Sequence, residues 1–520
     1  MRQLTLLFFL FINSSLFAQN QYPEITKLSL DFDHDMKILT ATYDLFDAEG
    51  ETMDVHFLVS DDGGLSYLLN TSNATGDVGS GILSGSDKSI SWDATGLLTG
   101  NGDYKVKIVA DDLYLINIQE IVDQVDSNRL LANLEFIQGT RHRNVNAAHL
   151  EAVKDTIEQR FIDVNLETVR KDFMYGNYIA QNIIGSLEGA LHADTTYIVD
   201  GHFDSVSNSP GADDNGSAVA GLLEAARVLA PYQFNKTLRF IGFDLEEEGL
   251  LGALNYTRED IPDSEIIKGV FNMEMIGYYA EEPNTQTLPS GFEILYPDVQ
   301  AELAADEFRG NFINNIGDQN SMALMTAYEA AATTYVPNLK VVSIAAPELW
   351  PLLTPDLARS DHAPFWLIEV PALMLTDGSE YRNPNYHTPN DVLETLDFTF
   401  MSNVVKAVVG AVIDEAGIRH STIATANFSV LTSNKNTLDC GLSIYPIPSD
   451  ENLSLRFENC AFATLDIQIF DSLGKLVLSQ KTSPASSTTV SLGLEHLKPG
   501  LFVLRISNGE QWLSRKIVKQ

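Results

Sequence analysis

Hydrophobic and polar positions follow different periods in different parts of the chain, and the changes predict where its domains lie. Over residues 22–112, stretches such as 53–59 and 104–110 place an apolar side chain at every second position, and turns rich in Asp, Gly and Ser separate them. A period of two is typical of strands with one buried face. We therefore expect a small β-sandwich over residues 22–112.

From residue 113 to residue 420 the pattern changes to that of alternating helices and strands. Apolar positions recur at helical spacing over 150–161 and 215–230, and short apolar runs such as TTYIVDGHF, TLRFIGFD, GVFNMEM and VPALMLTD accompany them. Helices that alternate with buried strands predict an α/β sandwich. We expect one α/β domain over 113–420.

The last part of the chain returns to the strand pattern. Residues 421–439 are rich in Ser, Thr and Asn, which is typical of an exposed linker. Alternation of period two then resumes over residues 440–520, as in Leu453 and Leu455, and predicts a second small β-sandwich. The first sandwich is similar in pattern to immunoglobulin-like or fibronectin-like modules, and no motif in it assigns it a role.

The first residues have the order of a signal peptide, which we expect over residues 1–18. Arg2 precedes an apolar run from Leu4 to Ile12, and small or polar residues follow as far as Ala18. This run is too short to span a bilayer, and no later stretch reaches the roughly 20 apolar residues that a membrane helix needs. We therefore expect export and no transmembrane segment.

The bulk composition excludes one class of partner. Asp and Glu together number 71 against 33 Lys and Arg, so the formal net charge is -38. Such a charge repels phosphate backbones, and we expect no nucleic-acid partner. The cysteines are Cys440 and Cys460, too few for a disulfide framework. Export would permit one bridge between them, which the sequence leaves open.

Five polar clusters fall at the ends of apolar runs in the α/β segment, where open α/β sheets bind their ligands. They are GHFDS at 201–205, PGADDNGS at 210–217, DLEEEGLLGA at 244–253, NMEMIGYY at 272–279 and RNPNYHTPND at 382–391. Taken alone, each is as easily a solvated loop. Together they bring two imidazoles and several carboxylates to one edge of the predicted sheet, which indicates a metal site.

These side chains are of the types that bind zinc. Imidazole nitrogen and carboxylate oxygen are zinc ligands, and a hydrolytic zinc site leaves one coordination position for water. Two zinc ions that share a carboxylate lie roughly 3.5 to 4 Å apart and can act on both the attacking and the departing oxygen. Asp204 follows His202 by two residues and can accept a hydrogen bond from its imidazole, which would fix the tautomer.

Six spaced motifs in the α/β segment resemble those of the M28 family of zinc aminopeptidases. They are similar to GHxDS, GADDNGS, EExG, an acidic residue before MxG, SDHxPF and YHTxxD, and they occur in the family's order. The resemblance implies a three-layer sandwich with a mixed, mostly parallel sheet, two Zn²⁺ ions and hydrolysis of the N-terminal peptide bond. Carried over by motif, one zinc is held by His202 and Glu274, the other by Glu247 and His387, and Asp214 bridges them.

Glu246 is the general base that the resemblance implies. It lies beside Glu247, so it can take a proton from the attacking water and give it to the leaving amine. Asp213 and Glu248 are adjacent alternatives that the sequence does not exclude. Tyr386 matches a position where some relatives place a tyrosine that stabilises the tetrahedral intermediate, and an aromatic packed in a loop is the alternative.

One ligand differs from the usual residue of the family, and the motifs contain further residues outside the ligand set. Many members of the family have Asp where this chain has Glu274, which shifts the carboxylate by one methylene and retains metal binding. Asp361 and His362 belong to the SDHxPF motif, and we assign them to the outer shell of the site or to shaping its pocket. We expect the loops 285–320 and 345–365 to build that pocket.

Residues 440–520 resemble the C-terminal sorting domain of the type IX secretion system of Bacteroidota. The stretches IYPIPSDENLSLRF, FDSLGKLV and LKPGLFVLRISNGEQWLSRKIVKQ carry the resemblance. It implies the secretion machinery as a partner, passage across the outer membrane, and a secreted or surface-attached location. A permanent carbohydrate-binding or adhesive module is the alternative.

The sequence therefore predicts a secreted zinc-dependent aminopeptidase that acts on peptide or protein N-termini. One alternative is a glutaminyl cyclase, an acyltransferase on a similar fold with overlapping ligands. The other is a non-catalytic binding protein. The complete ligand set with Glu246 beside it argues against the binding protein, because a scaffold needs no general base.

Overall fold

The computed structural model describes residues 20–98, 102–430, 441–449, 451–458, 464–471, 475–483, 487–508 and 512–520. The predicted signal peptide over 1–18, residues 431–439 of the predicted linker, and both Cys440 and Cys460 lie outside these residues. Contacts divide the chain into two units, Met1–Val430 and Leu431–Gln520. In the described part, no helix is long and apolar enough to cross a membrane.

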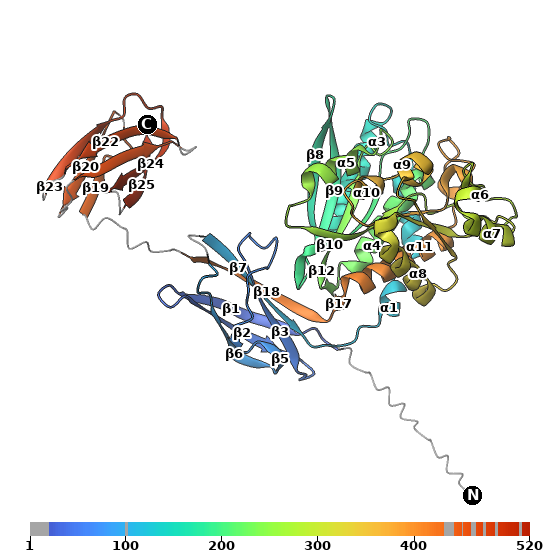
Figure 1. The fold of residues 1–520 in the computed structure, drawn as a ribbon, viewed down its shortest axis with the longest axis horizontal. Coiled ribbons are helices and arrows are strands. Elements are labelled where there is room, and N and C mark those ends of the chain that lie inside the picture. Colours follow the sequence, from blue (N-terminus) through green and yellow to red (C-terminus); the bar gives the residue numbers. More distant parts are fainter. Residues whose placement is uncertain are drawn as a thin grey trace, which may run out of the picture. The chain divides into compact units, whose positions relative to one another are not determined.

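The first unit contains a sandwich of two four-stranded sheets (Figure 1). One sheet has the order β1 (Glu24–Asp33), β2 (Ile38–Phe46), β6 (Gly85–Asp93) and β4 (Thr75–Gly76), and the other has the order β18 (Ser421–Val430), β7 (Gly102–Asp111), β3 (Met53–Ser60) and β5 (Gly79–Ile82). Alternate side chains of β2 and β3 are buried, among them Tyr43 and Phe57, and form the core between the sheets. The period-two pattern of the sequence thus forms the strands that it predicts.

Strand β18 corrects the predicted linker over 421–439. It pairs with β7 in antiparallel register, from Ser421 opposite Asp111 to Val430 opposite Gly102, and so belongs to the first sandwich. Its Phe428 and Val430 are buried in the core of that sandwich. Composition alone favoured an exposed segment, but Thr, Ile, Phe and Val also suit strands, and pairing with β7 decides between the two states.

The larger part of the first unit is built on a mixed sheet of eight strands. Its order is β15 (Val341–Ala345), β14 (Ile313–Gly317), β16 (Ala372–Thr376), β13 (Ile266–Met273), β10 (His192–His202), β12 (Lys236–Phe243), β9 (Tyr178–Leu187) and β8 (Glu167–Tyr175). Strands β12, β10, β13 and β16 run parallel to one another. Strands β9 and β8 form an antiparallel edge, and β14 and β15 run antiparallel to β16. The central parallel strands are apolar on both faces, as buried parallel strands are.

Helices cover both faces of this sheet and give three layers (Figure 1). One face packs against α1 (Ile118–Val122), α2 (Ser127–Ile137), α3 (Ala147–Asp163), α4 (Ala218–Leu229), α8 (Met322–Tyr335) and α11 (Phe398–Ala416). The other packs against α5 (Leu251–Asn255), α6 (Phe292–Leu295), α7 (Pro297–Ala305), α9 (Trp350–Leu353) and α10 (Ala363–Trp366). Tyr197 and Val199 of β10 join the first core and Ile198 the second, which confirms the predicted three-layer α/β sandwich. Beside the layers, β11 (Gln233–Phe234) pairs with β17 (Ile418–Arg419).

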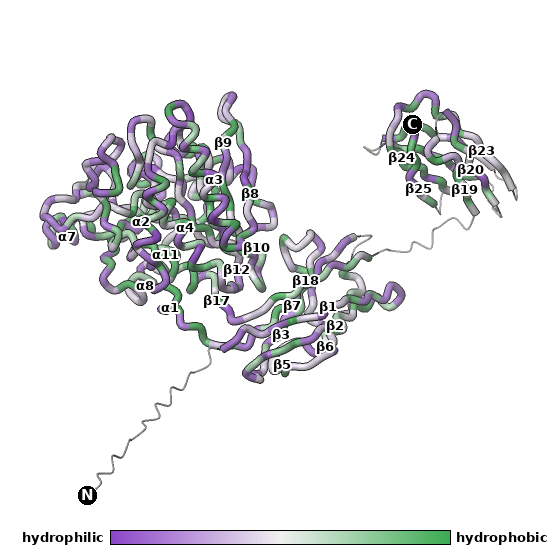
Figure 2. The backbone as a smooth tube through the Cα atoms, turned by 180° about the vertical axis from the view of Figure 1, so that it is seen from behind, coloured by the Kyte–Doolittle hydropathy of each residue, from purple (hydrophilic) through white to green (hydrophobic). Residues whose placement is uncertain are grey.

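Helices α4 and α11 are neighbours in the first helical layer, and their sequences explain their position. Both carry mainly hydrophobic residues, which appear green in Figure 2, and most of their side chains are buried. The carboxylate of Asp397 caps α11 by accepting hydrogen bonds from the backbone N–H of Thr399 and Phe400, at 2.8 and 2.9 Å. Gly417, with a φ of 75°, follows the last turn of α11 and ends the helix.

The second unit is a small sandwich formed from the strands predicted over 440–520. One sheet has the order β19 (Gly441–Tyr445), β20 (Asn452–Glu458) and β23 (Ser487–Gly493), and the other has the order β22 (Leu476–Thr482), β21 (Leu465–Phe470), β24 (Gly500–Ser507) and β25 (Trp512–Lys519). Leu455, Ile467 and Leu504 are buried between the two sheets. This unit has its own hydrophobic core.

Candidate active site

The polar clusters of the sequence meet at the carboxyl ends of neighbouring parallel strands. His202 is the last residue of β10. Glu246 and Glu247 lie in the turn after β12, and Glu274 directly follows β13. Because β10 pairs in parallel with both β12 and β13, these strand ends share one edge of the sheet. That edge is where an open α/β sheet binds its ligands.

One group of possible metal ligands surrounds the buried imidazole of His202. Its Nε2 lies 3.2 Å from Glu274 Oε2, 3.6 Å from Asp214 Oδ1 and 3.8 Å from Glu246 Oε2. Ligand atoms of His202, Glu246 and Glu274 all lie within 4.8 Å of one another. This spacing suits a single ion held by His202 and Glu274, with the Glu246 carboxylate beside it.

A second group forms around His387. Its Nε2 lies 2.9 Å from Asp214 Oδ2 and 3.3 Å from Glu247 Oε2, and ligand atoms of the three residues lie within 4.8 Å of one another. Asp214 thus turns Oδ1 toward His202 and Oδ2 toward His387. The structure brings the five predicted ligands together, with Asp214 between the two groups.

The donor set fits two cations. Four carboxylates, those of Asp214, Glu246, Glu247 and Glu274, converge with two imidazoles. In the described part of the chain, Glu247 Oε1 is buried without a hydrogen-bond partner. Buried like charges at this spacing are unfavourable unless metal ions or protons neutralise them. Nitrogen and oxygen donors without thiolate are the ligands of hydrolytic zinc sites.

Burial and mutual repulsion shift the pKa values of these groups. Burial raises the pKa of Glu247 to about 7, and the Asp214 carboxylate adds to the shift. Burial also raises the pKa of Glu246 well above its usual range. Burial alone would lower the pKa of His202, but the carboxylates of Glu246 and Glu274 raise it well above its usual value. A bound cation opposes this uptake of protons, because metal ligands coordinate in their deprotonated form.

Asp204, which we expected behind His202, positions both glutamates. Its Oδ1 lies 3.4 Å from His202 Nδ1 and accepts a hydrogen bond from the backbone N–H of Glu246 at 3.0 Å. Its Oδ2 accepts a hydrogen bond from the backbone N–H of Glu247 at 3.2 Å. One buried carboxylate therefore lies beside the imidazole and holds the turn that carries Glu246 and Glu247.

Asp391 is a positioning residue that sequence reasoning missed. Its buried carboxylate accepts hydrogen bonds from the backbone N–H of Asp213 at 2.8 Å and of Asp214 at 3.1 Å. It thereby orients the segment that presents the bridging carboxylate. The available signal was its place at the end of the motif that contains His387.

Two further residues hold Glu274. Ser360 Oγ donates a hydrogen bond to Glu274 Oε2 at 2.7 Å, and Asn215 Nδ2 donates to the same oxygen at 3.4 Å. Asn215 Oδ1 accepts from the backbone N–H of Met275 at 2.9 Å, and its peptide bond to Asp214 is cis. Both residues lie inside predicted motifs, so their positions were visible in the sequence and their roles were not.

Arg141 supports the connection between β10 and Asp214 through hydrogen bonds to its backbone. Its fully buried guanidinium donates hydrogen bonds to the backbone carbonyls of Phe203 at 2.6 Å, Pro210 at 2.8 Å and Gly211 at 2.8 Å. The two ends of the single connection between β10 and Asp214 are thereby held together. No sequence signal points to Arg141, because its acceptors are backbone atoms that any residue supplies.

The two candidate outer-shell residues of the SDHxPF motif differ. Asp361 is fully buried near the charge of His202, and neither of its oxygens has a hydrogen-bond partner among the described residues. The ring of His362 instead packs edge-on against Trp366, and its Nε2 lies 2.9 Å from the carbonyl of Leu357. Of the two roles expected for His362, these contacts favour shaping the pocket, because Leu357 is one of the residues that line it.

The alternatives to Glu246 as a base are engaged elsewhere. Asp213 accepts hydrogen bonds from the backbone N–H of Gly277 at 2.9 Å and from Asn383 Nδ2 at 2.7 Å. Glu248 forms an ion pair with Arg143 at 2.9 Å. Their oxygens therefore serve the fold, whereas Glu246 borders the first ligand group.

Tyr386 lies against the second ligand group. Its ring stacks on that of His387, with centroids 3.8 Å apart, and its hydroxyl accepts a hydrogen bond from Arg359 Nη2 at 3.0 Å. Burial, with the Asp214 carboxylate nearby, raises the pKa of Tyr386 above its usual value. The phenol is therefore neutral at physiological pH and can donate a hydrogen bond.

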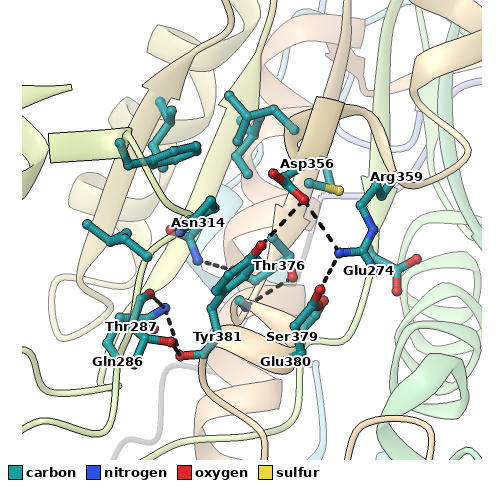
Figure 3. Close-up of a pocket in the computed structure, with 18 of the residues that line it drawn as sticks. Glu274, Gln286, Thr287, Asn314, Asp356, Arg359, Thr376, Ser379, Glu380 and Tyr381 are labelled. Atoms are coloured by element: carbon teal, nitrogen blue, oxygen red, sulfur yellow. Dashed lines mark hydrogen bonds and ion pairs between the residues drawn. The ribbon is translucent and has the colours of Figure 1, made fainter. Parts of the chain in front are cut away.

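A pocket opens beside Glu274 (Figure 3). It holds about 620 Å³, part of it open to solvent, and Phe292, Ile316 and Met374 contribute to its apolar wall. At its rim the carboxylates of Asp356 and Glu380 pair with Arg359, which Figure 3 shows on the side of Glu274. Residues from both predicted pocket loops, 285–320 and 345–365, line it, and the segment 374–386 adds a wall that we did not predict.

Comparison with known families gives two matches. Residues 182–412 match peptidase family M28, and residues 443–520 match the secretion system C-terminal sorting domain. Both resemblances stated from the motifs are thereby confirmed. The first match contains all five predicted ligands and Glu246.

Individual relatives are similar to about half of the chain. The uncharacterized protein YfbL of Escherichia coli is 29% identical over 51% of this chain and 80% of its own length. The aminopeptidase YwaD of Bacillus subtilis is 28% identical over 46% of this chain, which spans 45% of that relative. The solved structure of the LapA aminopeptidase of Legionella pneumophila aligns with a TM-score of 0.44 and 19% identity, over 59% of this chain and 77% of that one.

The family match, the ordered motifs and the convergence of their side chains at one sheet edge agree with one another. The hydrolysis of peptide bonds is the chemistry of this family. The second match indicates secretion, with the protein released or attached at the cell surface. The chain therefore contains two segments of recognised families: residues 182–412 match peptidase family M28, and residues 443–520 match the secretion system C-terminal sorting domain.

Proposed function

We propose that the protein is an exported aminopeptidase that uses two zinc ions to remove single residues from the N-termini of peptides. The match to family M28 and the name of its relative YwaD support the class of reaction. The observation that carries the proposal is the position of Asp214, with one oxygen toward His202 and the other toward His387. A carboxylate between two such groups suits a pair of ions.

Glu246 is the general base in this proposal. When bound, zinc acts as a Lewis acid and increases the acidity of water. Glu246 takes a proton from the attacking water and passes it to the amine that leaves. Its place in the first ligand group and the hydrogen bond from its backbone N–H to Asp204 support this role, because both hold the carboxylate near the reacting atoms.

The pocket receives the side chain of the substrate's N-terminal residue. Glu274 belongs both to the first ligand group and to the pocket wall, so a residue seated there has its peptide bond at the ligands. The apolar wall favours a hydrophobic side chain. The hydroxyl of Tyr386, which also lines the pocket, donates a hydrogen bond to the oxyanion that develops on the attacked carbonyl.

Export is the second part of the proposal. The sorting domain over 443–520 supports passage through the secretion machinery to the cell surface or the medium. The signal peptide over 1–18 stays a prediction and would direct the first step across the inner membrane. Substrates would then be peptides or protein N-termini outside the cell.

The test uses the zinc-loaded full chain with leucine p-nitroanilide and its N-acetylated analogue. We expect hydrolysis of the free amine compound alone. Glu246→Gln should lower kcat by about 10² to 10⁴-fold while zinc content stays unchanged. Glu248→Gln is the matched control, since it changes the neighbouring carboxylate that pairs with Arg143, and it should retain near wild-type kcat.

Two results would contradict the proposal. Near-full turnover by Glu246→Gln would exclude this residue as the base. Conversion of an N-terminal glutaminyl peptide to its pyroglutamyl form, without release of any amino acid from other peptides, would instead identify a glutaminyl cyclase.

A further inference from the structure

A second cluster of acidic side chains lies in the first sandwich, separate from the candidate active site. Oxygens of Asp47, Glu51 and Asp112 all lie within 4.8 Å of one another. Asp47 and Glu51 belong to the connection between β2 and β3, and Asp112 directly follows β7. Within the described residues, none of the three pairs with Lys or Arg, and Asp112 alone has an ion-pair partner, His420 at 2.6 Å. Three carboxylates therefore converge with little opposing charge.

Asp47 gives independent evidence for a bound ligand. This residue is 4% exposed, and its Oδ2 accepts a hydrogen bond from the backbone N–H of Glu51 at 2.7 Å. Its Oδ1 is buried and has no hydrogen-bond partner in the part of the chain that the structure describes. A buried carboxylate oxygen without a partner is unfavourable, because it has lost its hydrogen bonds to water and has formed no other hydrogen bond in the folded protein. A cation would supply the missing partner.

Asn20 brings a fourth oxygen to the cluster. Its Nδ2 donates hydrogen bonds to Asp112 Oδ2 at 3.1 Å and to Glu51 Oε2 at 3.4 Å. Its Oδ1 is buried and lacks a partner among the described residues. A half-turn of the amide exchanges the nitrogen with the oxygen, since the two atoms occupy nearly equivalent positions. Asn20 can therefore offer a neutral oxygen where the carboxylates meet.

We propose that Asn20, Asp47, Glu51 and Asp112 bind a calcium ion. All four donors are oxygens, which hard cations prefer, whereas zinc selects nitrogen and sulfur more strongly. Calcium takes six to eight oxygens in a flexible arrangement, so side chains from separate segments can share it with water. Magnesium demands a near-ideal octahedron and releases its water reluctantly, which suits such a scattered donor set less well.

The site joins segments that are distant in the sequence. Asp112 lies where the chain leaves β7 for the eight-stranded sheet, and its partner His420 lies where the chain returns to β18. The His420 ring also stacks on Tyr22, with centroids 3.9 Å apart. A calcium ion would therefore fasten the start of the sandwich, the turn between β2 and β3, and the outgoing chain at one point.

The experiment is calcium binding by the zinc-loaded full chain. Equilibrium dialysis with metal analysis should give one calcium per chain with a Kd of about 10⁻⁴ to 10⁻³ M, the range of extracellular calcium modules. Thermal denaturation should show a midpoint that rises with calcium concentration, because the ion binds the folded state. Asp47→Asn and Glu51→Gln should each weaken binding at least about tenfold. Glu51 is exposed, so its variant keeps the test valid if Asp47→Asn fails to fold.

Matched controls separate this site from the zinc centre. Asp61→Asn removes one exposed acidic charge from a turn of the same sandwich and should bind calcium as the wild type does. Zinc content and peptidase turnover should stay unchanged in Glu51→Gln, so a failure of the calcium proposal leaves the proposed peptidase function untouched. The absence of calcium binding, wild-type binding by both variants, or stronger binding of magnesium than of calcium would each overturn the assignment.

Discussion

The replacement of Asp391 tests whether a residue that touches no predicted ligand side chain controls the metal centre. Its carboxylate accepts hydrogen bonds from two consecutive backbone N–H groups, of Asp213 and Asp214, at 2.8 and 3.1 Å, and it is fully buried. Asp391→Ala leaves both N–H groups without an acceptor in a place that solvent does not reach. Each unsatisfied buried group costs about 1–3 kcal/mol, so the variant should lose roughly 2–6 kcal/mol.

Part of this loss should appear in zinc affinity. The two N–H groups belong to the segment that presents Asp214, and the loss of a supporting residue typically weakens a metal site by about 10- to 100-fold. The zinc Kd is measured by competition with a chromophoric chelator, and the free energy of unfolding by urea denaturation. Activity is compared at saturating zinc, where a mispositioned Asp214 should still lower kcat.

The control is Asn390→Ala, which truncates the exposed side chain next to Asp391 and should leave zinc affinity unchanged. An unchanged zinc Kd in Asp391→Ala, with normal folding, would refute the reasoning. It would mean that the remaining contacts alone hold the bridging carboxylate in place.

Three further outcomes follow from single contacts. Tyr386→Phe should lower kcat by about 10² to 10³-fold with little change in KM, whereas Tyr381→Phe, which removes a hydroxyl bonded to Asp356 in the same pocket, should not. Burial lowers the pKa of His362 to about 4, below its unfolded value of about 6.5. The unfolded chain therefore binds a proton more readily than the folded protein, so the contribution of the neutral His362 to stability is complete above pH 6.5 and is lost as the pH falls toward 4. Urea denaturation should show this decline, up to roughly 3 kcal/mol, and His362→Gln should reduce it. Asp397→Ala should destabilise the protein by about 1 kcal/mol through loss of the α11 cap, measured as a lower thermal midpoint, and wild-type stability would contradict the capping role.

The ligands of the site could be predicted because each lies in a local motif at the end of an apolar run. His202 ends a strand, Glu274 follows one, and the parallel order of those strands brings the two together. Glu246 was identified by the motif resemblance, and Asp204 by its position two residues after His202. Their roles as general base and supporting carboxylate remain part of the proposal. Position in the chain indicates which side chains lie close together, but not which of them is protonated.

The roles of the residues that hold the ligands could not be predicted from the sequence, because their partners are distant in the chain or are backbone atoms. Arg141 binds carbonyls, and Asp391 binds amides, which leave no side-chain signature. Ser360 meets Glu274 across the sheet edge, a contact that the fold alone creates. For His362 the motif left two roles open, the outer shell or the pocket wall, and only its contacts with Leu357 and Trp366 favour the second.

The pairing of β18 with β7 has a consequence for how the protein is made. The first sandwich takes its last strand from residues that follow the entire eight-stranded domain, so that domain is an insertion within the sandwich. During synthesis, β7 emerges long before β18 and exposes a full strand edge until the peptidase domain is complete. A fragment that ends before Ser421 would keep that edge open and would be prone to aggregate. The sandwich can therefore close only on a chain whose peptidase domain has already been made.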